Sequence, residues 1–221
     1  MCANFIRPST VSSRLHGHGF NVLVLVRFGF CQSRVDNSMF VYPDNSRVLI
    51  LLLYVDDIIL TYSDPSHIHT FIRTLGAEFD IKDLGRLHYF LGVEVTYHTD
   101  SLHLTQNKYT VDFLKRINLL DCKPVSTPMA SKGTLSRTDG TKLADPTLYR
   151  HIVGALQYLT MTRRDISFVV QHVAQFMGSL GDVHFEYVKC ILRYLKGTLG
   201  FGLPIHRSPD CSFLIAYSNA D

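Results

Sequence analysis

Two adjacent acids, Asp56 and Asp57, interrupt a long apolar stretch that reads "LLLYVDDIILTY" over residues 51–62. Burying a carboxylate among aliphatic side chains costs several kcal/mol unless another group compensates its charge. The runs on both sides of the acids are β-branched and aliphatic, so we expect a β-hairpin with the acids at or beside its turn. At such a turn the strands are buried while the carboxylates stay accessible to a divalent cation.

Two interpretations of this turn are open. Mg²⁺ prefers one or two carboxylates completed by phosphate oxygens and water, and pairs of such ions support in-line phosphoryl or nucleotidyl transfer. Asp is also a common turn residue, so a solvated β-turn without any chemistry explains the same pattern. On the hairpin alone, the plain turn is the more economical interpretation, and the surrounding sequence has to decide.

The elements that would position the acids can be read from capping residues and periodicity. Asp64 and Pro65 predict the start of a helix after the hairpin. A second hairpin is expected from residues 87–98 and 101–106, followed by a helix over 107–120. After a segment rich in Pro, Ser, Thr and Gly, three further helices are expected to open at Asp145, Asp165 and Asp182, the last closed by Gly197. The resulting fold class is α+β.

Composition narrows the function only slightly. The chain has 221 residues, 46% hydrophobic, with a formal net charge of +3, which permits a polyanionic partner without requiring one. Its five cysteines are scattered, which indicates reduced thiols in an intracellular protein. The apolar runs are too short for a membrane span, and the amino terminus does not have the pattern of a secretory signal.

The acidic hairpin resembles the catalytic "YVDD" hairpin of reverse transcriptases from copia-type LTR retrotransposons. The resemblance continues downstream in the expected order and covers roughly Gly29 to Asp221. The segments that carry it are "FDIKDLGRLHYFLGVEV" (79–95), "LTQNKYTVDFLKRINLLDCKPVSTPM" (104–129), "YRHIVGALQYLTMTRRDISFVVQHVAQFM" (149–177), "VKCILRYLKGTLGFGL" (188–203) and "AYSNAD" (216–221). The last of these is similar to the first strand of a ribonuclease H domain.

The resemblance implies roles for individual residues. Asp56 and Asp57 correspond to two of three palm carboxylates that hold Mg²⁺ while dNTPs are added to an RNA or DNA primer–template. Tyr54 would lie near the primer–template end, and its alternative is an aromatic side chain that packs on a neighbouring strand. Lys82, expected in the loop before the second hairpin, would lie near the leaving pyrophosphate and stabilise its charge or donate a proton. A solvated lysine explains Lys82 equally well.

The helix expected over 183–196 has one apolar and one basic face. Val188, Ile191, Leu192 and Leu195 form its predicted buried stripe. Lys189, Arg193 and Lys196 follow each other at helical spacing on another face, where they could contact a phosphate backbone. Arg163 and Arg164 would extend this patch. Solvated surface charge is the alternative for all of these side chains.

The chain also departs from the family pattern. The third palm carboxylate belongs to a motif resembling "DVKxAFL" farther upstream than this chain reaches, and the nucleotide-binding fingers would precede it as well. Residues 1–28 do not resemble the family, as if another reading frame or exon supplied them. Asn219 stands where a ribonuclease H strand would carry its first metal-binding Asp. We therefore expect a truncated enzyme that is inactive by itself.

These observations predict a partial polymerase palm followed by a three-helix thumb and connection. The expected divisions are an atypical segment at 1–33, the palm remainder at 34–120, a linker at 121–145, the helical unit at 146–200 and a truncated ribonuclease H start at 201–221. The function that the resemblance implies is RNA-directed DNA synthesis within a Pol polyprotein, in a cytoplasmic particle or the nucleus. The alternatives are a catalytically dead retrotransposon remnant with at most nucleic-acid binding, and an unrelated α+β structural protein with an acidic turn.

Overall fold

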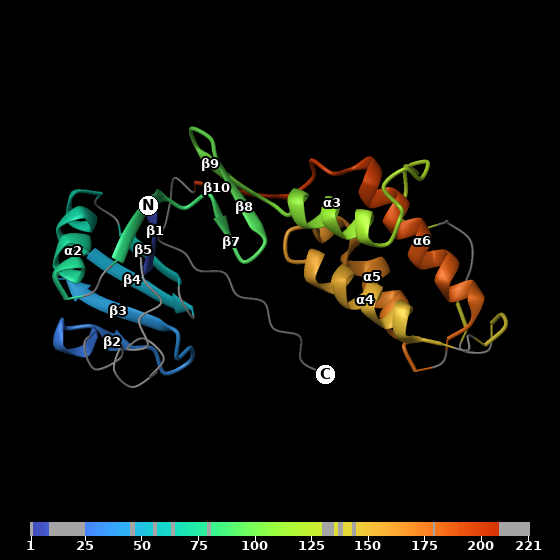
Figure 1. The fold of residues 1–221 in the computed structure, drawn as a ribbon, viewed down its shortest axis with the longest axis horizontal. Coiled ribbons are helices and arrows are strands. Elements are labelled where there is room, and N and C mark those ends of the chain that lie inside the picture. The colour runs from blue at the N-terminus through green and yellow to red at the C-terminus, as the bar shows by residue number, and fades with distance from the viewer. Residues whose placement is uncertain are drawn as a thin grey trace. The chain divides into compact units, whose positions relative to one another are not determined.

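The structure, a computed structural model, is described for residues 2–8, 25–44, 47–54, 57–62, 65–78, 81–129, 135–136, 139–142, 145–178 and 180–207. The chain divides into two compact units, Met1–His88 and Tyr89–Asp221. Each unit contains one antiparallel sheet together with helices (Figure 1). This confirms the predicted mixture of helices and antiparallel strands. None of the helices in the described ranges combines the length and apolar character needed to cross a bilayer.

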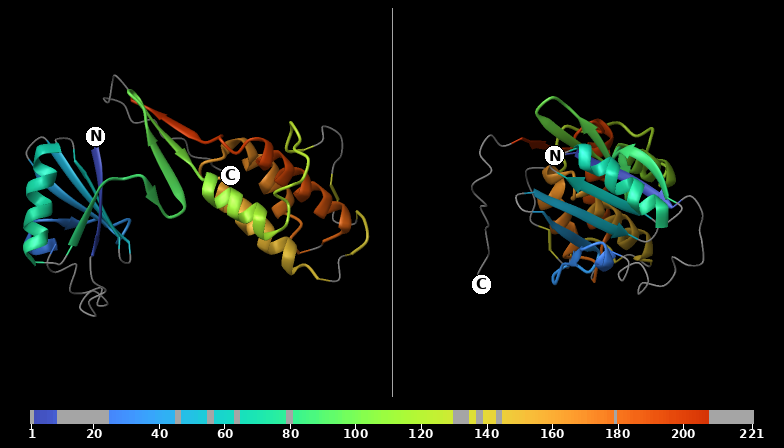
Figure 2. Two further views of the ribbon diagram at one scale, coloured as in Figure 1. Left: turned by 45° about the horizontal axis from the view of Figure 1, so that its top comes forward. Right: turned by 90° about the vertical axis from the view of Figure 1, so that its left-hand side faces the viewer.

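The first unit is built on a six-stranded sheet with the order β2-β3-β4-β5-β1-β6. Its strands are β1 (Cys2–Pro8), β2 (Cys31–Gln32), β3 (Met39–Asp44), β4 (Arg47–Tyr54), β5 (Asp57–Tyr62) and β6 (Ile81–Arg86). Helix α2 (Pro65–Glu78) lies against this sheet (Figure 2), and it begins at Pro65 as the sequence predicts. The helix packs Phe71, Ile72 and Leu75 on a core that includes Leu51 and Leu60 of the sheet.

The strand β1 comes from the segment for which the sequence predicts no structure. It lies between β5 and β6, with Cys2 opposite Tyr62 and Ile6 opposite Ile58 in the ladder with β5. Its other side pairs with β6, where Pro8 is opposite Ile81. A central strand bonds to two neighbours, so the amino-terminal residues 2–8 are an integral part of the sheet.

The second unit contains a four-stranded sheet with the order β10-β9-β8-β7. Its strands are β7 (Tyr89–Phe90), β8 (Val93–Tyr97), β9 (Ser101–Thr105) and β10 (Leu203–His206). The hairpin of β8 and β9 confirms the second predicted hairpin. The single strand expected over 87–98 is wrong, because Leu91 and Gly92 turn the chain between β7 and β8 with φ of 47° and 76°. Two positive φ values are typical of a tight hairpin turn, and glycine adopts them without strain.

The helices of the second unit are α3 (Asn107–Arg116), α4 (Thr147–Leu159), the 3₁₀ turn η1 (Arg164–Ile166), α5 (Ser167–Ala174) and α6 (Asp182–Gly197). They share one core, to which Leu156, Val170 and Leu192 contribute fully buried side chains. Helix α3 ends four residues earlier than predicted, because Asn118 adopts a positive φ of 55° and the Leu119 amide bonds back to Leu114.

Two of the three predicted helix starts in this unit agree with the structure. The Asp145 carboxylate accepts the Thr147 amide at 2.8 Å, and α6 begins at Asp182 and ends at Gly197 as expected. The start expected at Asp165 is wrong in detail. This carboxylate is bound by Arg163 at 2.7 Å, and a 3₁₀ turn precedes α5.

Candidate functional site: the acidic hairpin and the basic residues of α6

The strands β4 and β5 form the hairpin that the acidic motif predicts. Tyr54 at the end of β4 is opposite Asp57 at the start of β5. Asp57 is half-buried, whereas Tyr54 is 48% exposed. Opposite residues of a ladder project from the same face of a sheet, so the phenol and the carboxylate are neighbours at this end. Asp56 lies outside the described residues.

Lys82 lies at the same end of the sheet, although not in the predicted loop. It is an exposed residue of β6, and it is opposite Arg7 of β1 in the ladder. In the next row, Ile6 of β1 is opposite both Asp83 of β6 and Ile58 of β5. The strand that carries Lys82 is therefore two strand spacings, roughly 10 Å, from the strand that carries Asp57. The structure brings the two residues to one end of the sheet without direct contact between their strands.

The residues at this end fit a hard divalent cation in chemistry but not in number. Carboxylate oxygens are what Mg²⁺ prefers, and one or two of them suffice when phosphate oxygens complete the shell. The strand next to β5 is β1, whose sequence "CANFIRP" contains no acid. Within the described ranges, no group of three or more His, Cys, Asp or Glu side chains could hold a metal ion. Asp57 is the described member of the acid pair that the sequence predicts as ligands of Mg²⁺.

The three basic residues predicted on α6 have different environments. The predicted apolar stripe of this helix is confirmed, since Val188 and its three partners are at most 1% exposed. Lys189 forms an ion pair with Glu186 at 2.6 Å and lies over the Phe185 ring. Its charge is thus partly matched on the helix surface, where such pairs contribute little to stability.

Arg193 and Lys196 instead bind the main chain of the segment before α4. Arg193 Nε donates to the Lys123 carbonyl at 2.7 Å, and Lys196 Nζ donates to the Cys122 carbonyl at 2.6 Å. Both side chains are half-buried. The predicted basic face of α6 therefore also holds another segment of the chain, through hydrogen bonds to the main chain at Cys122 and Lys123.

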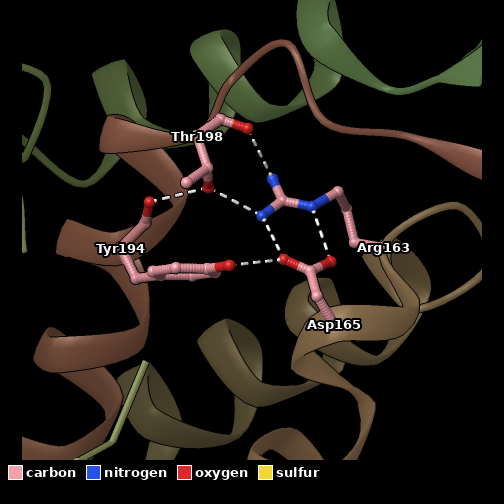
Figure 3. A network of polar contacts seen from close by, with 4 residues as sticks. All are labelled: Arg163, Asp165, Tyr194 and Thr198. Atoms are coloured by element: carbon pink, nitrogen blue, oxygen red, sulfur yellow. Dashed lines mark hydrogen bonds and ion pairs between the residues drawn. The ribbon is translucent and has the colours of Figure 1, made fainter. Parts of the chain in front are cut away.

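Arg163 does not extend the basic surface, so this part of the prediction is wrong. The residue is 2% exposed, and its guanidinium makes a bidentate contact with Asp165 at 2.9 and 2.7 Å (Figure 3). It also donates to the carbonyl and the hydroxyl of Thr198, just after α6, while Tyr194 donates to Asp165 at 2.9 Å. Arg164, its neighbour, is exposed.

The Arg163 network shifts the titration of its carboxylate. Burial raises the pKa of Asp165, but hydrogen bonds from Arg163 and Tyr194 and the guanidinium charge outweigh it, so the pKa lies below its ordinary value. Desolvation, together with the bond to Asp165, raises the pKa of Tyr194. The sequence signal for this network is weak, because Arg-x-Asp spacing is common and Thr198 is distant in the chain.

Another polar contact that the sequence did not predict positions α3. Glu94 of β8 accepts the Lys108 amide at 2.7 Å and the Thr105 hydroxyl at 3.3 Å. A carboxylate at this place satisfies a free amide of the helix start and interacts favourably with the helix dipole. Nearby, the buried Gln106 accepts the Thr162 hydroxyl at 2.7 Å. These residues belong to the segments that carry the family resemblance, and in this unit their contacts serve the fold.

A match to a known protein family supports the resemblance that the acidic hairpin carries. The profile of the reverse transcriptase (RNA-dependent DNA polymerase) family matches residues 20–131, about half of the chain. The chain belongs to this family. The match begins at residue 20, so the expectation that residues 1–28 do not resemble the family is wrong for residues 20–28. No solved structure matches the chain.

Two transposon Pol polyproteins and a mitochondrial protein are among the relatives of this chain. The retrovirus-related Pol polyprotein from transposon RE1 of Arabidopsis thaliana is 45% identical over 197 residues, which cover 89% of this chain and 13% of that protein. The Pol polyprotein from transposon TNT 1-94 of Nicotiana tabacum is 39% identical over 186 residues, 78% of this chain and 14% of that protein. An uncharacterised mitochondrial protein of Arabidopsis thaliana is 46% identical over 160 residues, 72% of this chain and 66% of that protein. The chain thus spans a small part of the polyproteins, and it is similar to their reverse transcriptase domain.

Proposed function

We propose that this chain is part of the reverse transcriptase of a copia-type Pol polyprotein, with the β4–β5 hairpin as its catalytic acidic element. The observation that supports this most strongly is the hairpin itself, in a chain that matches the reverse transcriptase family. The proposed reaction is template-directed nucleotidyl transfer, in which dNTPs extend a primer on an RNA or DNA template. Residues 34–120 would serve as the palm remainder, and residues 146–200 as the thumb and connection.

In this proposal Asp56 and Asp57 hold Mg²⁺ through carboxylate oxygens. The bound metal would supply charge stabilisation to the attacking and leaving oxygens. Tyr54 would contact the primer–template end, and its exposure and its position opposite Asp57 support this role. Lys82 is exposed at the same end of the sheet, where a cation would stabilise the departing pyrophosphate.

A chimaera tests the proposal. The region of this chain that matches RE1 replaces its counterpart in the RE1 polyprotein, and primer extension on an RNA template is measured. We expect extension by the chimaera, and extension near background after Asp56→Asn/Asp57→Asn. The matched control is Asp83→Asn, because this exposed acid of β6 bonds to the Gly85 amide and an asparagine oxygen preserves that bond. Full activity without the two acids would contradict the proposed site.

The 221-residue polypeptide by itself should not extend a primer, because only two of the three expected carboxylates lie within it. Extension by the purified polypeptide that Asp57→Asn abolishes would contradict this part of the proposal. It would also mean that the two acids suffice for the chemistry.

A second candidate function is nucleic-acid binding without catalysis. It is favoured by β1, because this strand lies next to β5 and contributes no carboxylate that could complete a metal site with the acidic hairpin. In this case the basic residues Lys189, Arg193 and Lys196 would carry the remaining function. A chimaera that binds primer–template but does not extend it, while unaltered RE1 does, would favour this candidate.

A further inference from the structure

Residues 122–127, here named the strap, are fixed along α6 by contacts of several kinds. Lys196 and Arg193 donate to the carbonyls of Cys122 and Lys123, which are consecutive in the chain. Farther along, the Cys190 thiol lies 3.7 Å from the Thr127 carbonyl. Val125 packs against the core of the unit. The strap therefore has its own apolar anchor in addition to the two cations.

The strap also approaches the end of α6 closely. A Cβ atom added at Gly197 would lie 3.1 Å from Pro124 Cβ, tighter than most contacts between such atoms. Glycine at this position allows the strap to pass directly over the last turn of the helix. The two carbonyls are thereby held within reach of the cations that lie one turn apart.

These contacts orient the cations without neutralising them. A carbonyl oxygen carries only a partial charge, so Arg193 and Lys196 keep their full positive charges. Arginine has five N–H donors and lysine three, and the strap takes one from each. The exposed Lys123 adds a third cation from the strap itself. Two long side chains that are normally mobile are thus fixed in place, with donors to spare for an anion.

We propose that the strap makes Arg193 and Lys196 a preoriented binding pair for the phosphodiester backbone of nucleic acid. The inference deepens the nucleic-acid contact put forward above and rests on it. The strap and a phosphate bind the two cations at the same time, because the strap carbonyls and the phosphate oxygens accept from different N–H donors. Preorientation strengthens binding since the ligand no longer has to immobilise the two side chains. Lys189 is outside this arrangement because Glu186 pairs with it.

The experiment measures binding of a fluorescent RNA–DNA hybrid duplex to the full chain by anisotropy, over a range of salt concentrations. Two variants loosen the strap without changing the net charge: Val125→Ser removes its apolar anchor, and Pro124→Gly adds backbone freedom. We expect each to weaken duplex binding about fivefold. Arg193→Ala/Lys196→Ala should weaken binding more and reduce its salt dependence. Lys189→Ala, which removes a charge without touching the strap, should have a smaller effect than either strap variant.

Alkylation of the Cys190 thiol, followed by peptide mass spectrometry, reports whether the strap is closed. Cys190 should react faster in the strap variants, and the duplex should slow its reaction in the wild type, because coupling between two sites is reciprocal. Duplex that speeds the reaction would mean that phosphate displaces the strap, and it would overturn the inference. Strap variants that bind like the wild type, while Arg193→Ala/Lys196→Ala binds weakly, would overturn it and leave the proposed contact intact. A wild-type chain without salt-sensitive binding would overturn both.

Discussion

Two places in this molecule put carboxylates next to apolar side chains, and they do so in different ways. In the second unit, Asp165 is a single carboxylate matched by one guanidinium and one phenol from the same chain. In the first unit, Asp56 and Asp57 follow each other directly between two aliphatic strands. A carboxylate that is paired with a guanidinium and a phenol, as Asp165 is, stabilises the fold. Adjacent like charges repel each other, and a divalent cation relieves this repulsion.

The residues of the family segments fall into two groups, those with partners within the fold and those at the acidic hairpin. Glu94, Gln106 and Arg163 each bind a partner elsewhere in the second unit, so their contacts account for their presence without any ligand. Asp57 lies at the end of a sheet, beside an exposed tyrosine and at the same end as an exposed lysine. The first group indicates how the fold is held, and the second contains the residues that we propose for the chemistry.

The largest effect is expected from Arg163→Ala. The change leaves Asp165 and Thr198 without their guanidinium partner, and we expect a loss of about 2–3 kcal/mol in the free energy of unfolding of the second unit. Urea denaturation followed by circular dichroism measures it. The matched control is Arg164→Ala, which removes an exposed charge next in sequence and should change stability by less than about 0.5 kcal/mol. Equal effects of both changes would show that the network does not hold the fold.

A smaller loss is expected from Tyr194→Phe. The change removes the hydrogen bond from the phenol to Asp165 while it keeps the ring in place. We expect a loss of about 1 kcal/mol in unfolding free energy, because the carboxylate keeps its two bonds to Arg163. In an Arg163→Ala background the same change should cost a different amount, since the two groups share one carboxylate. Strict additivity in this double-mutant cycle would contradict a coupled network.

The smallest expected effect is on the stability of the chain at acidic pH. Because the pKa of Asp165 is lowered in the folded chain, its contribution to stability is present above about pH 4, the ordinary range of this group, and is lost as pH falls through the lower folded value. The stability of the wild type should therefore fall more steeply below pH 4 than that of Arg163→Ala. Denaturation curves collected at several pH values test this. Parallel pH profiles would show that Arg163 does not depress the pKa of Asp165.

Local patterns predicted most of the elements, and long-range contacts account for the differences. The hairpin at Asp57, the helix from Pro65 and the stripe at Val188 follow from periodicity and capping, which act within a few residues. Strand β1 could not be predicted, because its place depends on pairing with strands more than fifty residues away. The partners of Arg193 and Lys196 were missed for the same reason, since main-chain carbonyls about seventy residues distant leave no trace in helical spacing.

The same distinction applies to the candidate site. The acid pair is a local signal, and its interpretation as a metal site comes from the family rather than from geometry. The resemblance predicts Lys82 in a loop before the second hairpin, whereas pairing with β1 makes it part of a strand. The position of Arg163 before a helix and beside a second arginine predicts a surface charge, whereas the residue is buried and binds Thr198, which is distant in the chain.

The measurement that tests the central claim most directly is thermal unfolding of the wild type and of Asp56→Asn/Asp57→Asn, each with and without Mg²⁺. If the acids serve a metal rather than the fold, the double variant melts at a higher temperature than the metal-free wild type, because the repulsion between the two carboxylates disappears. Millimolar Mg²⁺ should then raise the melting temperature of the wild type alone. A double variant that is less stable than the metal-free wild type would contradict the account, because the two carboxylates would then be part of what holds the sheet together.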